Sequence, residues 1–96
     1  MQNAEVFKWD DLPMDSPMPL LERQRIIGNK MMISNVVLKK GCFVNSHSHE
    51  NEQFALVVSG EVRFGLGKEG SDNYRELVLK SGEVLYLPSF VEHSAF

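Results

Sequence analysis

Residues 41–60 read GCFVNSHSHENEQFALVVSG, and the rest of the chain can be understood from this stretch outward. His47 and His49 are one residue apart, so on an extended strand both imidazoles project from the same face. Two imidazole nitrogens that face one point suit zinc, iron, nickel or copper. Gln53 adds a neutral side-chain oxygen, and His93 lies near the C-terminus. We therefore expect a β-barrel to bring His93 back to the pair and to close a metal site.

The length and composition of the chain are those of one small globular domain. The chain has 96 residues, and 43% of them are hydrophobic, which is enough for a packed core and too many for a disordered chain. The net charge is -3, and no cluster of Lys and Arg stands out. We therefore expect neither nucleic acid nor a membrane surface as a partner.

Cysteine content and the N-terminal stretch bear on the compartment. Cys42 is the only cysteine, so no internal disulfide can form, as is usual in a reducing compartment. Residues 1–10 carry acids and no long apolar core, which is unlike a secretory signal. No apolar run approaches the length of a membrane span. These observations predict a cytoplasmic protein.

Short apolar runs between Gly, Pro and Asn turns predict an all-β chain. Three prolines within 11–19 exclude a helix there and favour an extended loop. No segment has a helical pattern, so we expect an antiparallel β-barrel or jelly roll. Residues 1–28 should form an N-terminal arm with edge strands and 29–96 the barrel core, as one domain overall. The expected strands are 6–10, 20–27, 31–38, 43–49, 54–59, 62–66, 74–79 and 84–88.

Two spaced patterns of Gly, His and Pro span residues 41–93. The first is Gly41-x5-His47-x-His49-x3-Gln53-x6-Gly60, and the second is Gly82-x5-Pro88-x4-His93. Together they resemble the two signature motifs of the cupin superfamily, in the family's order and with its usual short separation. The chain is most similar to the small single-domain cupins of the cupin-2 type.

The cupin resemblance implies a small β-barrel whose metal is held by three histidines and a Glu or Gln. Carried over residue by residue, the implied ligands are His47, His49, Gln53 and His93. The implied cofactor is a divalent transition metal, with Zn, Ni, Fe, Mn and Cu all compatible with this ligand set. Such sites usually leave one or two metal positions open to water or to a small-molecule substrate.

The chain departs from the common cupin motifs at two positions. Gln53 stands where the common motif has Glu, and four neutral ligands would leave the metal a stronger Lewis acid. Glu50 or Glu52 could ligate instead, but Gln53 keeps the six-residue step to Gly60. Phe90 stands where the second motif usually has Gly. Either the turn differs here, or Phe90 is strained at positive φ and forms an apolar wall near the site.

The Gln-type motif looks like that of cupins that convert unsaturated uronates to linear keto-sugar acids. In those proteins an acid, an aromatic residue and an arginine on the C-terminal strand handle the substrate, and this chain ends at Phe96 before such a segment. No catalytic residue can therefore be carried over, and the chain is either shortened or a different cupin. A missing last strand would leave an exposed edge, which a second copy in a homodimer could cover.

The expected function is therefore that of a metal-binding cupin in carbohydrate metabolism. The named reaction is isomerisation or ring opening of unsaturated uronates, or a related step on a small sugar acid or carbonyl compound. The alternatives are an iron-dependent dioxygenase and a non-catalytic cupin that binds or senses a small molecule such as a sugar. Arg23 and Arg25 share a strand face and could bind a substrate carboxylate, although a solvated face is the simpler interpretation.

Overall fold

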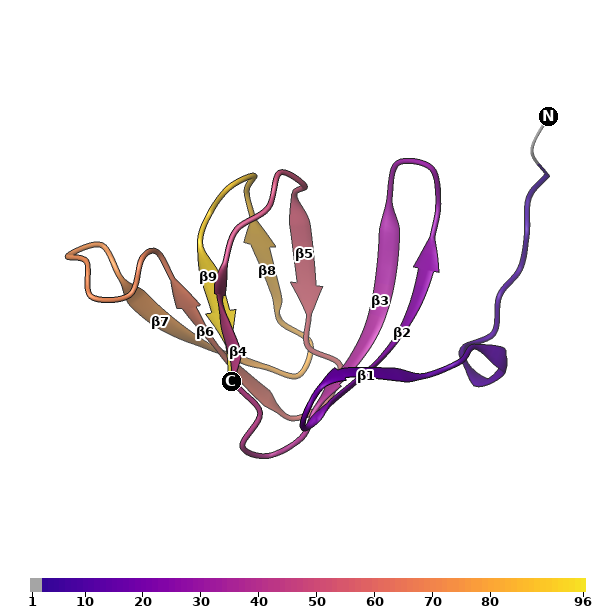
Figure 1. Cartoon of the computed structure of the whole chain (residues 1–96), viewed down its shortest axis with the longest axis horizontal. Helices are drawn as coiled ribbons and strands as arrows, with labels where there is room; N and C mark the ends of the chain where they lie inside the picture. Colours follow the sequence, from indigo (N-terminus) through magenta and orange to yellow (C-terminus); the bar gives the residue numbers. More distant parts are fainter. Residues whose placement is uncertain (1–2) are drawn as a thin grey trace. The chain divides into compact units, whose positions relative to one another are not determined.

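The computed structural model describes residues 3–96 and confirms the all-β, antiparallel class. Within these residues the chain divides into two compact units, 3–42 and 43–96. The predicted division at residue 28 stays a prediction, and its first two residues lie outside the described part. No helix within 3–96 is long and apolar enough to cross a membrane. Figure 1 labels the strands of both units.

The first unit is a three-stranded antiparallel sheet in the order β1-β2-β3. Its strands are β1 (Asp15–Met18), β2 (Leu21–Ile27) and β3 (Met32–Leu38). The β2–β3 hairpin keeps an unbroken register from Leu21↔Leu38 to Ile27↔Met32. Met18 pairs with Leu21 across the tight turn that joins β1 to β2. These pairings fix which side chains of β2 lie on the same face of the sheet.

Two predictions in the first unit are wrong. The predicted strand 6–10 is absent, and Trp9–Asp11 forms a short 3-10 helix instead (η1). Buried Gln24 holds this segment, because its Nε2 donates to the carbonyls of Trp9 and Leu12 at 2.7 and 3.0 Å. The predicted loop 11–19 contains β1 despite its prolines. Pro17 is tolerated there because β1 lies at the edge of its sheet.

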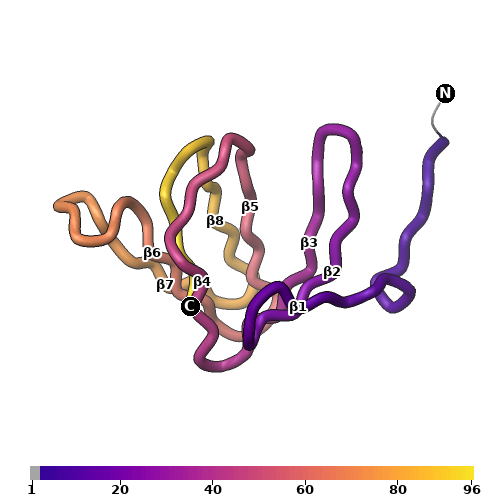
Figure 2. Tube along the Cα trace, in the orientation of Figure 1, coloured from indigo at the N-terminus to yellow at the C-terminus, as the bar shows by residue number. Residues whose placement is uncertain are grey.

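The second unit contains six strands in two sheets. One sheet has the order β4-β9-β6-β7, and the other pairs β5 with β8. The tube in Figure 2 shows the chain after β8 turning back so that β9 runs beside β4. The strands are β4 (Val44–His47), β5 (Gln53–Leu56), β6 (Glu61–Leu66), β7 (Arg75–Lys80), β8 (Val84–Leu87) and β9 (His93–Ala95).

A small apolar core joins the strands of the second unit. Its buried members are all aliphatic or aromatic, and Leu87 is the most buried of them at 1% exposure. They come from β6, β7, β8 and the residue after β5, so strands from both sheets contribute to one cluster. The core consists of Val57, Phe64, Leu66, Leu79 and Leu87.

Strand ends around the histidines differ from the expected ones. The predicted strand 43–49 ends at His47, so His49 lies in the loop that follows β4. His93 begins β9, a strand that was not among those expected from the sequence. This strand was not apparent from the sequence because it has only three residues and no alternating pattern.

Candidate metal centre

Three separate segments bring the histidines together. His47 ends β4 and pairs directly with His93, the first residue of β9, so their side chains are cross-strand neighbours. His49 comes from the loop after β4, and its backbone carbonyl accepts a 2.8 Å hydrogen bond from the amide of Phe90. This bond ties the loop that carries His49 to the loop that precedes His93.

The three imidazoles form a compact group in the described part of the chain. One ligand nitrogen from each of His47, His49 and His93 lies within 4.8 Å of the others. The ring centroid of His93 is 4.3 Å from that of His47 and 5.1 Å from that of His49. His93 is only 4% exposed, whereas His47 lies at the surface. The group is therefore open to solvent on one side, as a site that receives a small molecule must be.

Backbone carbonyls orient all three imidazoles through the same ring nitrogen. The Nδ1 atoms of His47, His49 and His93 lie 2.9, 2.7 and 3.0 Å from the carbonyl oxygens of residues 45, 51 and 91. A carbonyl oxygen only accepts, so each Nδ1 carries the hydrogen and donates it. Each neutral ring then has its lone pair on Nε2, which is the arrangement found in metal-binding histidines.

Gln53 is the fourth residue of the group. It begins β5, and its Oε1 lies 3.1 Å from Nε2 of His49. With the His49 hydrogen on Nδ1, these two atoms present lone pairs to each other, and a shared cation would satisfy both. The alternative ligand Glu52 is engaged elsewhere, because its carboxylate accepts the hydroxyl hydrogen of Tyr86 on β8. The residues present therefore fit a transition metal with three imidazole ligands and one amide ligand.

The electrostatic environment favours uncharged imidazole at the buried position. Burial lowers the pKa of His93 below its ordinary value of 6.5, and the neighbouring His47 and His49 act in the same direction. The hydrogen bond to the carbonyl of Val91 opposes this shift without cancelling it. His93 is thus held in the neutral form that can ligate a metal.

Phe90 has the positive φ that the glycine of the family motif would adopt. Its φ is 66°, and its side chain is 67% exposed. Phe90 therefore occupies this turn with left-handed backbone geometry, which is strained for a residue with a side chain. The hydrogen bond from its backbone amide to the carbonyl of His49 could not be predicted from the sequence, because side-chain type carries no signal of a backbone contact.

Comparisons with known proteins agree with the fold. The model of the cupin domain family matches residues 34–96, which is more than half of the chain. No curated protein matches. The crystal structure of an RmlC-like cupin from Shewanella frigidimarina NCIMB 400 is similar with a TM-score of 0.81 and 25% identity, over 99% of this chain and 82% of that one.

A second solved structure, KdgF from Halomonas sp., is similar with a TM-score of 0.81 and 22% identity. The similarity covers 97% of this chain and 81% of that one. This likeness shows a shared fold. The antiparallel sheets and the likeness to both solved structures agree with the match to the family model. Because that model matches more than half of the chain, the chain belongs to the cupin family.

Proposed function

We propose that His47, His49, His93 and Gln53 bind one divalent transition metal. The observation that carries this proposal is the common orientation of the three rings, each with Nδ1 toward a backbone carbonyl, so that a neutral ring has its lone pair on Nε2. The ligand atoms of the histidines already lie within 4.8 Å of one another, so little rearrangement is needed. A metal bound there would act as a Lewis acid on a carbonyl or hydroxyl oxygen.

The reaction that we propose is isomerisation or ring opening of an unsaturated uronate, or a related step on a small sugar acid. The support is the Gln-type motif, in which Gln53 replaces the usual carboxylate and adds no negative charge to the site. His47 is exposed, so a substrate oxygen can reach the group from solvent. The exposed side chain of Phe90 borders the turn that leads to His93 and can contact the carbon skeleton of a ligand.

The first test is the metal content of untagged protein that is purified without chelators and without a nickel column. We expect close to one equivalent in the wild type and a large loss in His49→Ala. Glu61→Gln is the control, because Glu61 is an exposed acidic residue at the start of β6, outside the proposed ligand set, and should not alter metal content. A wild type that stays folded, carries no metal and resists reconstitution would overturn the assignment.

The identity of the metal and the assay of turnover then separate the functions. Loss of an unsaturated uronate with nickel or zinc bound supports isomerisation or ring opening. Oxygen consumption with ferrous iron bound would indicate a dioxygenase, and a tightly held sugar without turnover would indicate a binding or sensor cupin. Each outcome assigns a different chemistry to the same four side chains.

The proposed assembly is a homodimer in the cytoplasm. Its support is a row of exposed apolar side chains on one face of the β5–β8 sheet, where Phe54 is 73% and Leu56 60% exposed. Large apolar side chains gathered on one face are usual at protein interfaces. Sedimentation equilibrium of the wild type and of Leu56→Lys measures this directly. A monomeric wild type would contradict the homodimer.

A further inference from the structure

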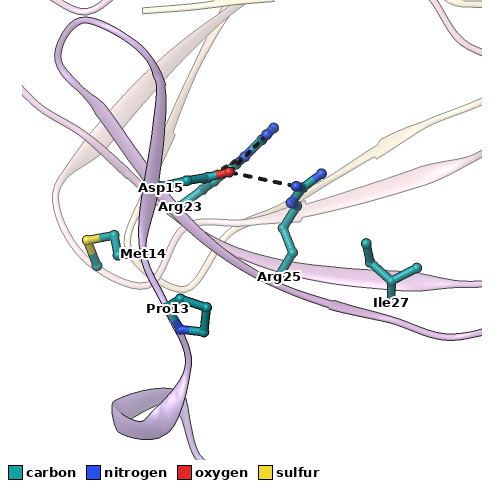
Figure 3. A pocket seen from close by; sticks show the side chains of 6 residues that line it. All are labelled: Pro13, Met14, Asp15, Arg23, Arg25 and Ile27. Atoms are coloured by element: carbon teal, nitrogen blue, oxygen red, sulfur yellow. Dashed lines mark hydrogen bonds and ion pairs between the residues drawn. The ribbon is translucent and has the colours of Figure 1, made fainter.

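The first unit contains a group of two arginines and one aspartate that the metal site does not use. Arg23 and Arg25 lie on the same face of β2, and Asp15 of β1 is the cross-strand partner of Arg23. Arg23 donates from Nε to Oδ1 of Asp15 at 2.9 Å and from Nη2 to Oδ2 at 3.3 Å. Figure 3 shows the Asp15 carboxylate reached by both guanidinium groups.

The two arginines are not equivalent. Nη2 of Arg25 lies 3.7 Å from Oδ2 of Asp15, which is an ion pair but too long for a hydrogen bond. Arg23 binds both oxygens of the Asp15 carboxylate, so the N–H donors of Arg25 make no hydrogen bond to Asp15. Two positive groups face one negative group, and the triad has an excess of one positive charge. A second carboxylate would complete the pairing.

A cavity of about 180 Å³ lies beside this triad. Its remaining lining is apolar and comes from Pro13, Met14 and Ile27, all labelled in Figure 3. The volume is below the roughly 300 Å³ at which pockets for drug-sized ligands begin. The cavity therefore suits a small molecule with one anionic end and a short carbon chain.

We propose that this cavity binds a small aliphatic monocarboxylate. Its carboxylate takes two N–H donors of Arg25, and its carbon chain lies against Met14 and Ile27. The planar fork of arginine matches the two oxygens of a carboxylate, which favours this anion over a spherical one. Inorganic phosphate is less suited, because it has no apolar part for the walls. The site lies entirely within the first unit and does not depend on the proposed metal.

The test is a titration of the whole ¹⁵N-labelled protein with butyrate at constant ionic strength, followed by backbone amide shifts. We expect saturable shifts at residues 14, 15 and 23–27 with a Kd on the order of 1 mM, as for a ligand of few atoms. Acetate should bind more weakly because it lacks the chain. Butyramide, which has the same shape without the charge, should cause no saturable shift.

Two variants should change the affinity in opposite directions. Arg25→Gln should weaken butyrate binding at least about tenfold, since a charge-assisted contact is lost. Asp15→Asn should strengthen it, because it frees the fork of Arg23 and raises the excess charge to two. Arg63→Gln on β6 is the matched control, as it also loses a surface ion pair, with Glu76, but should leave the affinity unchanged.

Several outcomes would overturn the proposal. These are equal binding of butyramide and butyrate, tighter binding of phosphate than of butyrate, or an unchanged affinity in Arg25→Gln. If Asp15→Asn fails to fold, Arg25→Lys replaces it. That variant keeps the charge and loses the fork, so it should bind butyrate more weakly than the wild type and more tightly than Arg25→Gln.

Discussion

Phe90 and Leu20 both have a φ of 66°, in the left-handed region that favours glycine. Left-handed geometry costs a side-chain-bearing residue roughly 1–2 kcal/mol. The amide of Phe90 nevertheless donates to the carbonyl of His49 at 2.8 Å, so this geometry is part of what holds the His49 loop. Strain of this kind is often retained next to functional sites.

Replacing Phe90 with glycine should therefore stabilise the fold. Phe90→Gly relieves the backbone strain, and the greater freedom of glycine in the unfolded chain offsets about 0.4–1 kcal/mol of that gain. We expect a net increase of about 0.5–1 kcal/mol in the free energy of unfolding, measured in urea. Phe90→Ala keeps the strain and should show no gain. A clear loss of stability in Phe90→Gly would mean that the ring packs against the protein.

The ionisation of Tyr86 makes the stability of the fold depend on pH in the alkaline range. Its hydroxyl donates to the carboxylate of Glu52, and this hydrogen bond is the main reason that its pKa is raised above 10.0. The folded protein thus holds the tyrosine proton more tightly than the unfolded chain. The stabilisation is fully present below pH 10.0 and is lost as the pH rises through the folded pKa.

Glu52→Gln should move the pKa of Tyr86 back toward 10.0. The measurement is the ultraviolet absorbance of tyrosinate during an alkaline titration. Tyr74 also has a raised pKa, so the comparison is made in a Tyr74→Phe background, where only Tyr86 titrates. An unchanged pKa in Glu52→Gln would show that the Glu52 contact does not govern the ionisation.

At the scale of elements, Gly65 of β6 lies where neighbouring side chains leave no room for a Cβ. This residue pairs with Ser94 on β9 and with Glu76 on β7. A Cβ at Gly65 would lie 2.5 Å from the hydroxyl oxygens of both Ser94 and Tyr74. The missing side chain therefore leaves room for Tyr74, whose hydroxyl donates to Glu76 at 2.9 Å. Ser94 follows His93, so this contact also supports the strand that presents a proposed ligand.

Gly65→Ala should destabilise the protein by about 1–3 kcal/mol, as overpacking in a filled site commonly does. Chemical denaturation measures the loss. The triple variant Gly65→Ala/Tyr74→Phe/Ser94→Ala removes both clashing hydroxyls. Its loss of stability should be smaller than the sum of the losses in the three single variants, because the substituted residues are in contact. Additive losses would contradict the proposed clash.

At the scale of the molecule, the proposed metal would link β4, β5 and β9 of the second unit through side chains separated widely in the sequence. A ligand that binds only the folded state stabilises it by mass action. At a metal concentration about 100-fold above Kd the gain is about 2.7 kcal/mol. Metal binding should therefore raise the free energy of unfolding by more than a single hydrogen bond contributes.

Addition of zinc to metal-free protein should raise Tm by roughly 10–20 °C for a domain of this size. A chelator should reverse the shift. The shift should be lost in His49→Ala and should shrink as the pH falls, because the imidazoles must be neutral to bind. An equal shift in His49→Ala would place the zinc at other side chains and contradict the proposed ligands.

Much of the fold class was predictable from local patterns. The Gly and Pro turns between short apolar runs predicted antiparallel β-structure, and seven of the expected strands have counterparts in β2 to β8. The segments that were predicted wrongly are those whose structure depends on long-range contacts. The N-terminal 3-10 helix depends on buried Gln24, β1 depends on pairing with β2, and β9 depends on pairing with β4 and β6.

The sequence by itself determined the β-rich class, because residue type and spacing within one segment are local properties, and its resemblance to the cupin motifs implied the four candidate ligands. Only the tertiary structure decided that His93 pairs with His47, that Nδ1 of His93 faces a backbone carbonyl, and that Arg23 and Arg25 share Asp15. Those features depend on strand register and on backbone carbonyls. Register is set by how whole strands pack together, and no single stretch of sequence contains it.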